Sequence, residues 1–166
     1  MEMNIVDHMP SWPDISCLRD RPEFMGIVAD RIWQTWWKGR GYTLEYVTGL
    51  VAESLAGKSL PFTLVAQDGA HFVGTVSAII SDMEERPLYS PWIAALWVDQ
   101  DHRQQGVGAA LVEKAFQAIM NFGREQAYLC AAREVVDFYR KRGWIEIEEN
   151  VGPRLLTVMR RMRSSQ

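Results

Sequence analysis

A run of apolar residues, WIAALWV at Trp92 to Val98, is followed by a pair of glycines, Gly106 and Gly108. Unbroken apolar runs of this length are typical of strands buried on both faces of a sheet. Beyond the glycines the apolar residues recur at helical spacing, and a second short apolar run follows at Ala127 to Ala131. This order predicts a β-α-β unit with two parallel strands, which constrains the fold more than any other feature of the chain.

Apolar patterns elsewhere predict further strands and helices around this unit. The runs at 61–67 and 71–80 flank a turn at 68–70 and predict an antiparallel hairpin. We expect other strands at 15–18, 144–149 and 155–161, and helices at 24–37, 44–55 and 134–143. The chain of 166 residues contains no internal repeat and no linker, so we expect a single α/β domain over residues 1–166.

Charge and cysteine content argue against several classes of function. The formal net charge is −3, which leaves no broad basic face of the kind that binds nucleic acid. Cys17 and Cys130 lie far apart and in no C-x-x-C pair, so neither a zinc site nor a disulfide framework is indicated. The sequence has no apolar run of about eighteen residues, and its first residues lack a basic and then apolar signal segment. We expect a cytoplasmic protein without a metal, a membrane or a nucleic acid as partner.

The glycine pair fits two nucleotide-binding motifs poorly. The dinucleotide fingerprint G-x-G-x-x-G has Leu111 in place of its third glycine, and the next strand, AYLCAA, offers no acidic residue for a ribose. A Walker A loop needs Lys-Ser or Lys-Thr after its second glycine, and neither follows here. The segment GKS at 57–59 has Ala52 where the first glycine would stand. What remains is a helix start shaped for packing alone, or one that binds an anion.

The residues around the pair favour an anion. The segment 103–110 reads R-x-x-G-x-G-A-A, which combines the basic Arg103, small residues that allow close approach, and the unpaired N–H groups of a helix start. A helix start of this kind binds a diphosphate through its backbone donors and the helix dipole. A pyrophosphate is therefore the natural ligand.

Two segments together resemble the GCN5-related N-acetyltransferase (GNAT) family. They are the strand and helix start LWVDQDHRQQGVGAAL and the later DFYRKRGW at 137–144. The resemblance covers roughly residues 15–160, with specific motifs between Trp92 and Trp144. It implies the acyl-CoA N-acyltransferase fold, a mixed, twisted sheet of six or seven strands flanked by helices. It also implies acetyl-CoA as co-substrate, without a metal.

The resemblance assigns the coenzyme to one stretch of backbone. The strand ending at Val98 is expected to splay from its neighbour and hold the pantetheine arm, and the helix start is expected to hold the pyrophosphate. One departure is recorded: Ala132 stands where family members often carry an asparagine that contacts the coenzyme. The implied cofactor-binding residues are Leu96, Trp97, Val98, Arg103, Gln104, Gln105, Gly106, Val107, Gly108 and Ala109.

Tyr139 matches the family tyrosine that protonates the departing thiolate. A phenol with an ordinary pKa near 10 is protonated at neutral pH and can serve as a general acid, although packing beside Phe138 is an alternative role. The attacking amine also needs a base. We expect Glu85 in this role, with Asp82 and Glu84 in the same loop as further candidates and His71 as a weaker one. A solvated loop without any catalytic role is an equally good interpretation for each single acid.

The resemblance also implies that the first two helices form the wall of the acceptor pocket. They carry an aromatic set that could hold an amine by cation–π contact or could simply be core: Trp33, Trp36, Trp37, Tyr42 and Tyr46. We expect Trp33 and Glu84 to be substrate-binding residues. The negative net charge favours a cationic acceptor.

These observations predict an acetyl-CoA-dependent N-acetyltransferase that acts on a primary amine of a small molecule or a peptide. Direct attack is expected, because neither cysteine has a base beside it in the sequence. Two alternatives stay open: a non-catalytic coenzyme A binding or sensing module, and an acyltransferase for longer acyl groups, which the small Ala94 and Ala95 would permit. A homodimer is possible on the family's precedent, and no motif identifies the acceptor.

Overall fold

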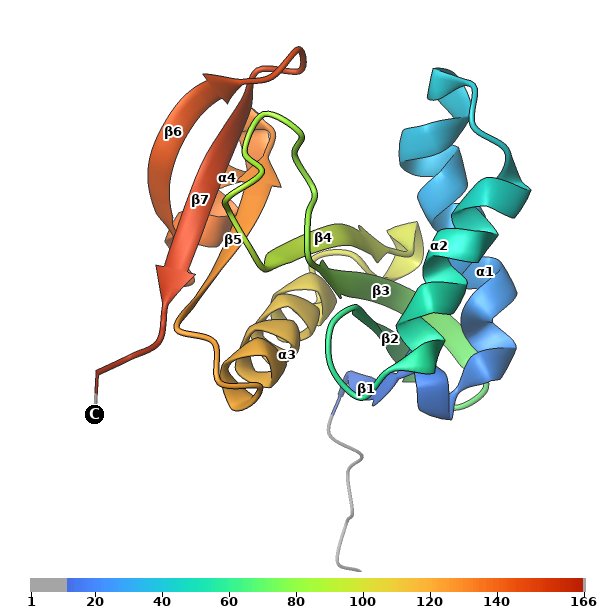
Figure 1. Ribbon diagram of the computed structural model, residues 1–166. Coiled ribbons are helices and arrows are strands. Elements are labelled where there is room, and N and C mark those ends of the chain that lie inside the picture. Colours follow the sequence, from blue (N-terminus) through green and yellow to red (C-terminus); the bar gives the residue numbers. More distant parts are fainter. Residues whose placement is uncertain (1–11, 166) are drawn as a thin grey trace, which may run out of the picture.

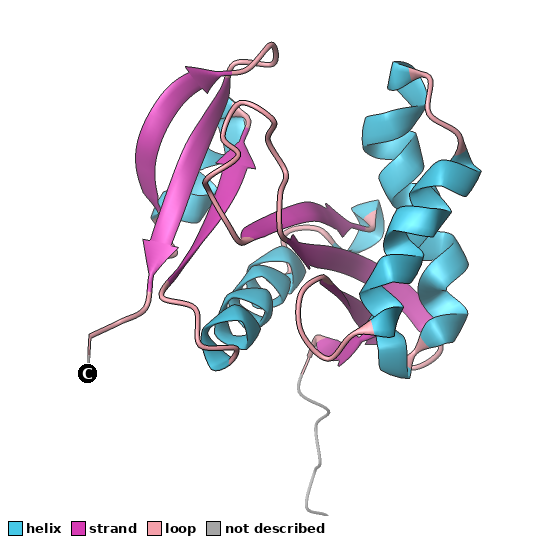
Figure 2. Ribbon diagram, viewed as in Figure 1, coloured by secondary structure: helices cyan, strands magenta, loops and turns pink. Residues whose placement is uncertain are grey.

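The computed structural model describes residues 12–165, in which seven strands form one mixed sheet flanked by helices (Figures 1 and 2). The expected sheet of six or seven strands is confirmed, and its strand order is β1-β2-β3-β4-β5-β7-β6. The strands are β1 Asp14–Cys17, β2 Phe62–Asp68, β3 His71–Ile79, β4 Trp92–Val98, β5 Gln126–Ala131, β6 Ile145–Val151 and β7 Leu156–Met162. The helices are α1 Met25–Ile32, α2 Leu44–Ala56, α3 Val107–Asn121 and α4 Val136–Arg140.

The helices cover both faces of the sheet. On β2, Leu64 and Ala66 pack in the cluster that contains the buried face of α3, whereas Val65 between them packs against α1 and α2. Successive strand residues point to opposite faces, so α3 lies on one face and the α1–α2 pair on the other. A third cluster, around Trp92 and Tyr128, joins β4 and β5 to the β6–β7 hairpin.

The predicted β-α-β unit is present as β4-α3-β5, and its two strands diverge. β4 and β5 are parallel, whereas the other neighbouring strands are antiparallel. Their register consists of one pair, Trp92 with Tyr128, next to a hydrogen bond from Tyr128 N to Pro91 O at 2.9 Å. Beyond that point the strands separate (Figure 1). Ala95 adopts a φ of 54°, which interrupts the regular pairing of β4 midway. The backbone from Leu96 to Val98 therefore borders an opening in the sheet.

Two predicted helices differ in detail from the observed ones. The segment expected as one helix over 24–37 begins with a 3-10 turn at Pro22–Phe24, continues as α1, widens into a π-helical turn at Trp33–Trp37 and ends in a 3-10 turn at Lys38–Arg40. Hydrophobic spacing over so short a segment does not distinguish a π-helical turn from an α-helical one. The helix expected over 134–143 is shorter, because a 3-10 turn at Arg133–Val135 precedes α4. Within residues 12–165 no helix is long and apolar enough to cross a membrane.

Candidate active site

The backbone before α3 bends sharply to present the helix start. Gln104 and Gly106 both adopt left-handed conformations, with φ of 63° and 82°. The chain enters the helix at Val107, and Ala110 N donates to Gly106 O at 3.0 Å. The N–H groups that precede Ala110 in α3 have no partner within the helix, as at any helix start. They form, with the positive end of the helix dipole, a site that suits an anion.

A cavity of about 320 Å³ lies at this helix start. Three of its lining side chains, His102, Arg103 and Arg142, are basic, and none is acidic. This charge pattern matches a phosphate-bearing ligand. The lining residues are Val98, His102, Arg103, Gln104, Gly106, Val107, Gly108, Ala109, Phe138 and Arg142. A second, more open depression of about 490 Å³ lies on α2, where Glu45 and Glu53 line it, so it lacks the charge that a phosphate requires.

The structure brings most of the expected coenzyme residues together around this cavity. Leu96, Trp97 and Gln105 are the expected residues that do not line it. The Leu96 side chain approaches Gly108 from β4, and Gln105 Nε2 donates to Asp101 O at 3.2 Å. Arg103 Nε donates to Val98 O at 2.9 Å, which ties the loop to the end of β4.

Three lining residues were missed by the sequence analysis: His102, Phe138 and Arg142. Arg142 Nη1 donates to Phe138 O at 2.6 Å, and its guanidinium lies 3.9 Å from the centre of the Phe138 ring. His102 Nδ1 lies 3.5 Å from Asp99 Oδ2 and has no hydrogen bond among the described residues. All three residues lie inside the two motif segments of the sequence analysis, which assigned none of them to the coenzyme.

Asp82 and Cys130 form a second polar pair, and Tyr139 lies near enough to Cys130 for the charge of one group to affect the pKa of the other. The Cys130 thiol, on β5, donates to Asp82 Oδ2 at 3.4 Å. Asp82 keeps an exposed surface, yet the protein around it raises the pKa of its carboxyl by desolvation, and the Cys130 hydrogen bond partly opposes this rise. Burial also raises the pKa of Cys130 to about 12 and that of Tyr139 to about 12. Both groups are therefore neutral at physiological pH.

The other candidate bases from the sequence analysis lie elsewhere and form no hydrogen bond with Cys130 among the described residues. Glu85 reaches the β6–β7 turn, where its Oε1 lies 3.1 Å from the position that a Cβ on Gly152 would occupy. Glu84 is exposed in the same loop, and His71 begins β3 at the hairpin turn, at the end of the strand away from this loop. Of these residues and Asp82, Asp82 is the one whose carboxylate accepts a hydrogen bond from β5, through the Cys130 thiol.

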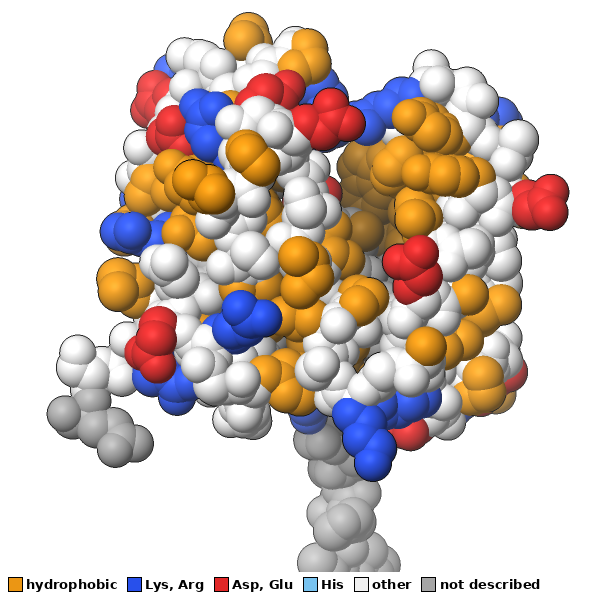
Figure 3. Space-filling view, in the orientation of Figure 1, with side chains coloured by type: hydrophobic (Ala, Val, Ile, Leu, Met, Phe, Trp, Pro, Cys, Tyr) orange, Lys and Arg blue, Asp and Glu red, His pale blue; other side chains and the backbone are white. Residues whose placement is uncertain are grey.

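The α1–α2 pair forms one wall of a hollow that faces this group (Figure 3). Hydrophobic side chains gather on that wall, and acidic and basic side chains lie along the rims. The rings of Trp37, Tyr42 and Tyr46 contact one another in edge-on and tilted geometries with centres 4.9–5.8 Å apart, and Tyr46 stays 47% exposed. Trp33 is half-buried and donates from Nε1 to Tyr42 O at 2.7 Å. The aromatic set therefore packs the α1–α2 junction and still offers surface to a ligand.

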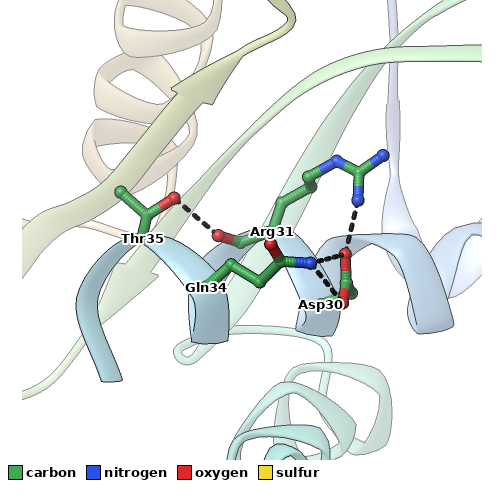
Figure 4. A network of polar contacts seen from close by, with 4 residues as sticks. All are labelled: Asp30, Arg31, Gln34 and Thr35. Carbon is green, nitrogen blue, oxygen red and sulfur yellow. Dashed lines mark hydrogen bonds and ion pairs between the residues drawn. The ribbon is translucent and has the colours of Figure 1, made fainter. Parts of the chain in front are cut away.

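A polar network holds the junction between α1 and the π-helical turn (Figure 4). Gln34 Nε2 donates to both carboxylate oxygens of Asp30, at 2.9 and 3.0 Å, and Arg31 pairs with the same carboxylate. Thr35 Oγ1 donates to Arg31 O at 2.7 Å. The Arg31 guanidinium lies 5.5 Å from the centre of the Trp97 ring, so the network also joins α1 to β4.

Comparison with known families identifies one model. Residues 60–146 match the acetyltransferase (GNAT) domain, a segment that includes β2–β5, α3 and α4. No curated protein is significantly similar to the chain. Within the described residues no cluster of three or more His, Cys, Asp or Glu could hold a metal ion.

Several solved structures share the fold over nearly the whole chain. An aminoglycoside 6'-N-acetyltransferase in complex with coenzyme A is 17% identical with a TM-score of 0.72, covering 92% of this chain and 98% of its own. The aminoglycoside 6'-N-acetyltransferase from Enterococcus faecium is 18% identical, with a TM-score of 0.68 and the same coverage of both chains. Ard1 from Thermoplasma volcanium is 19% identical with a TM-score of 0.65, also at 92% and 98% coverage. At these identities the likeness concerns the fold.

Proposed function

Because this chain belongs to the GNAT acetyltransferase family, we propose that it transfers the acetyl group of acetyl-CoA to a primary amine. The observation that carries this proposal is the basic cavity at the start of α3, which adjoins the opening between β4 and β5. Acetyl-CoA carries phosphates at one end and a thioester at the other, so it needs an anion site joined to a narrower channel. Family membership and the order of these two features along the sheet both support the assignment.

The chain's own residues divide the work of binding. Backbone N–H groups at the start of α3 receive the pyrophosphate, and the side chains of Arg103 and Arg142 supply positive charge around it. The left-handed Gly106 allows the turn that aims these N–H groups. The backbone of Leu96 to Val98, left without a β5 partner, pairs with the pantetheine arm. A neutral lining next to the basic cavity would suit the uncharged arm.

The reaction is a direct displacement at the thioester carbon. The acceptor nitrogen forms a bond to this carbon, the carbon–sulfur bond breaks, and the products are an acetamide and coenzyme A. The proton lost by the amine goes to Asp82, whose raised pKa makes it a better base than an ordinary aspartate. The thiolate that leaves takes a proton from Tyr139, which stays protonated because its pKa is raised to about 12.

Cys130 is a positioning residue in this scheme and not a nucleophile. A thiol with a pKa raised to about 12 contains almost no thiolate at neutral pH, and the thiolate is the form that would accept an acetyl group. Its hydrogen bond fixes the position of the Asp82 carboxylate relative to β5. This supports direct attack over a route through an acetylated cysteine.

The proposal is tested by thiol release from acetyl-CoA over a panel of amines: a polyamine, an aminoglycoside, an amino acid and a short peptide. We expect amine-dependent release with at least one of them, and mass spectrometry should show the acetylated product. Tyr139→Phe should release thiol more slowly, while the control Lys114→Gln, on the exposed side of α3, should match the wild type. A protein that binds coenzyme A and releases no thiol with any amine would instead be a sensing module. Faster release from a longer acyl-CoA would identify the third alternative.

A further inference from the structure

Three loops border the gap between the α1–α2 pair and the β6–β7 hairpin, and each contributes a charged residue. Asp82 comes from the loop between β3 and β4, Arg40 from the turn between α1 and α2, and Arg154 from the turn between β6 and β7. Figure 1 shows these turns on opposite sides of the gap above β4, and Figure 3 shows basic side chains on both rims of the hollow. Arg40 and Arg154 both act on Asp82, because the positive charge of each lowers the pKa of this carboxyl. We call these three residues the charged mouth.

The two arginines of the charged mouth have no carboxylate within ion-pair distance among residues 12–165. Other arginines of the chain do: Arg86 pairs with Glu148 at 2.7 Å, and Arg161 pairs with Glu113 at 2.5 Å. Arg40 and Arg154 also donate no hydrogen bond to a described residue. Both side chains are exposed, so their guanidinium groups are free to bind an anion from solution.

The aromatic wall beside the mouth already carries the protein's own cations. Lys38 Nζ lies 5.2 Å from the centre of the Trp33 ring, and the Arg40 guanidinium lies 5.8 Å from that of Trp37. A ligand ammonium would compete with these groups for the ring faces and would be repelled by them. The net charge of −3 does not offset this local repulsion of a ligand ammonium, because charges beyond about 8 Å are largely screened at physiological ionic strength.

Two further carboxylates lie beside the charged mouth. Glu84 and Glu85 lie in the same loop as Asp82, and the Glu85 carboxylate touches the β6–β7 turn two residues before Arg154. The mouth thus presents both signs of charge, with carboxylates in the β3–β4 loop and guanidinium groups on the flanking turns. A ligand of a single sign would meet repulsion from one of the two sets.

We propose that the acceptor is a dipolar amine, in which the reacting primary amine lies at Asp82 and a carboxylate of the same molecule lies between Arg40 and Arg154. The proposal rests on the acetyl transfer proposed above and names its substrate class. Guanidinium groups bind carboxylates with paired hydrogen bonds, so the carboxylate would orient the amine toward the thioester. The chemistry at the amine is unchanged, and the carboxylate takes no part in bond making. A free amino acid or a peptide with a nearby acidic group fits this description, whereas a polyamine does not.

The test uses pairs of acceptors that differ only in the anionic group: L-phenylalanine with L-phenylalaninamide, and L-lysine with cadaverine. The value kcat/KM is measured by thiol release for the wild type, Arg40→Gln, Arg154→Gln, the double variant and the control Lys114→Gln. We expect the wild type to prefer the carboxylate member of at least one pair at least tenfold. This ratio should fall at least fivefold in the double variant, mainly through KM, and stay unchanged in Lys114→Gln.

Two outcomes overturn the inference: a wild type that prefers the amide and cadaverine, and a carboxylate preference that the double variant keeps in full. Titration of the same proteins with coenzyme A separates this failure from failure of the proposed function. Coenzyme A binding with turnover of polyamines only, or with no turnover of any carboxylate-bearing amine, refutes the dipolar acceptor alone. If the wild type does not bind coenzyme A, the acetyl transfer itself is refuted.

Discussion

The Cys130 thiol donates a hydrogen bond to Asp82 Oδ2 across 3.4 Å, between residues 48 positions apart in the sequence. This contact links β5 to the loop before β4. In the proposed reaction the Asp82 carboxylate accepts the proton of the amine, and the Tyr139 phenol donates a proton to the leaving thiolate. Four predictions about this group follow from the structure, and a fifth concerns the coenzyme.

Replacing Asp82 by asparagine is expected to lower kcat by roughly 100-fold or more, the range found for the loss of a general base. Asparagine is close in size to aspartate and keeps an oxygen that can accept from Cys130, so the loss would reflect proton transfer. Steady-state kinetics with a saturating amine measure it. Glu85→Gln is the matched comparison. A larger loss of kcat in Glu85→Gln than in Asp82→Asn would identify Glu85 as the base.

The same substitution should stabilise the fold at pH 7. Because desolvation raises the pKa of the Asp82 carboxyl, the folded protein binds a proton there more tightly than the unfolded chain does. Stability is therefore lost as the pH rises from the unfolded pKa, about 4, through the raised folded value. Asp82→Asn avoids this loss, so its Tm should exceed that of the wild type at pH 7, and the difference should shrink toward pH 3. A lower Tm at pH 7 would show that the carboxylate is stabilising.

Cys130 is expected to influence the apparent pKa of the acidic limb in the pH profile of kcat. Its hydrogen bond lowers the pKa of Asp82, so Cys130→Ala should shift the acidic limb of the kcat profile to higher pH. Cys130→Ser keeps a donor and should shift this limb less. Full pH profiles of both variants provide the measurement. Identical acidic limbs in the wild type and in Cys130→Ala would mean that the thiol only fills space.

Tyr139→Phe is expected to reduce kcat at least tenfold with little change in the KM for acetyl-CoA, because the hydroxyl would act on the leaving thiolate and not on coenzyme binding. The wild type should also keep its activity on the alkaline side up to about pH 10, since the pKa of Tyr139 is raised to about 12. If Tyr139→Phe retains full turnover, the tyrosine serves packing beside Phe138 and Trp144, the rings that it contacts.

Local patterns in the sequence were enough to predict the β4-α3-β5 unit, because a doubly buried strand, a glycine-containing turn and an amphipathic helix are each determined by neighbouring residues. The sequence pattern also indicated most of the residues that line the cavity at the start of α3, and the binding of a pyrophosphate to backbone groups at 104–109 stays a prediction. The choice among Asp82, Glu84 and Glu85 could not be predicted, since the three acids are equivalent until the fold brings Cys130 to one of them. Arg40 and Arg154 likewise reach the mouth only through tertiary packing. Nothing in the apolar run 92–98 indicates that Ala95 adopts a left-handed conformation.

The central claim, that coenzyme A binds at the start of α3, is tested most directly by calorimetric titration of coenzyme A into the wild type and Gly108→Val. A Cβ on Gly108 would lie 3.7–3.9 Å from Leu96, Val98 and Phe138, which is ordinary contact, whereas the two further methyl groups of valine would enter the cavity. Gly108 is not among the residues with positive φ, so Gly108→Val should fold with an unchanged or higher Tm. We predict binding by the wild type and at least a tenfold higher Kd for Gly108→Val. Equal affinities in the two folded proteins would contradict the account.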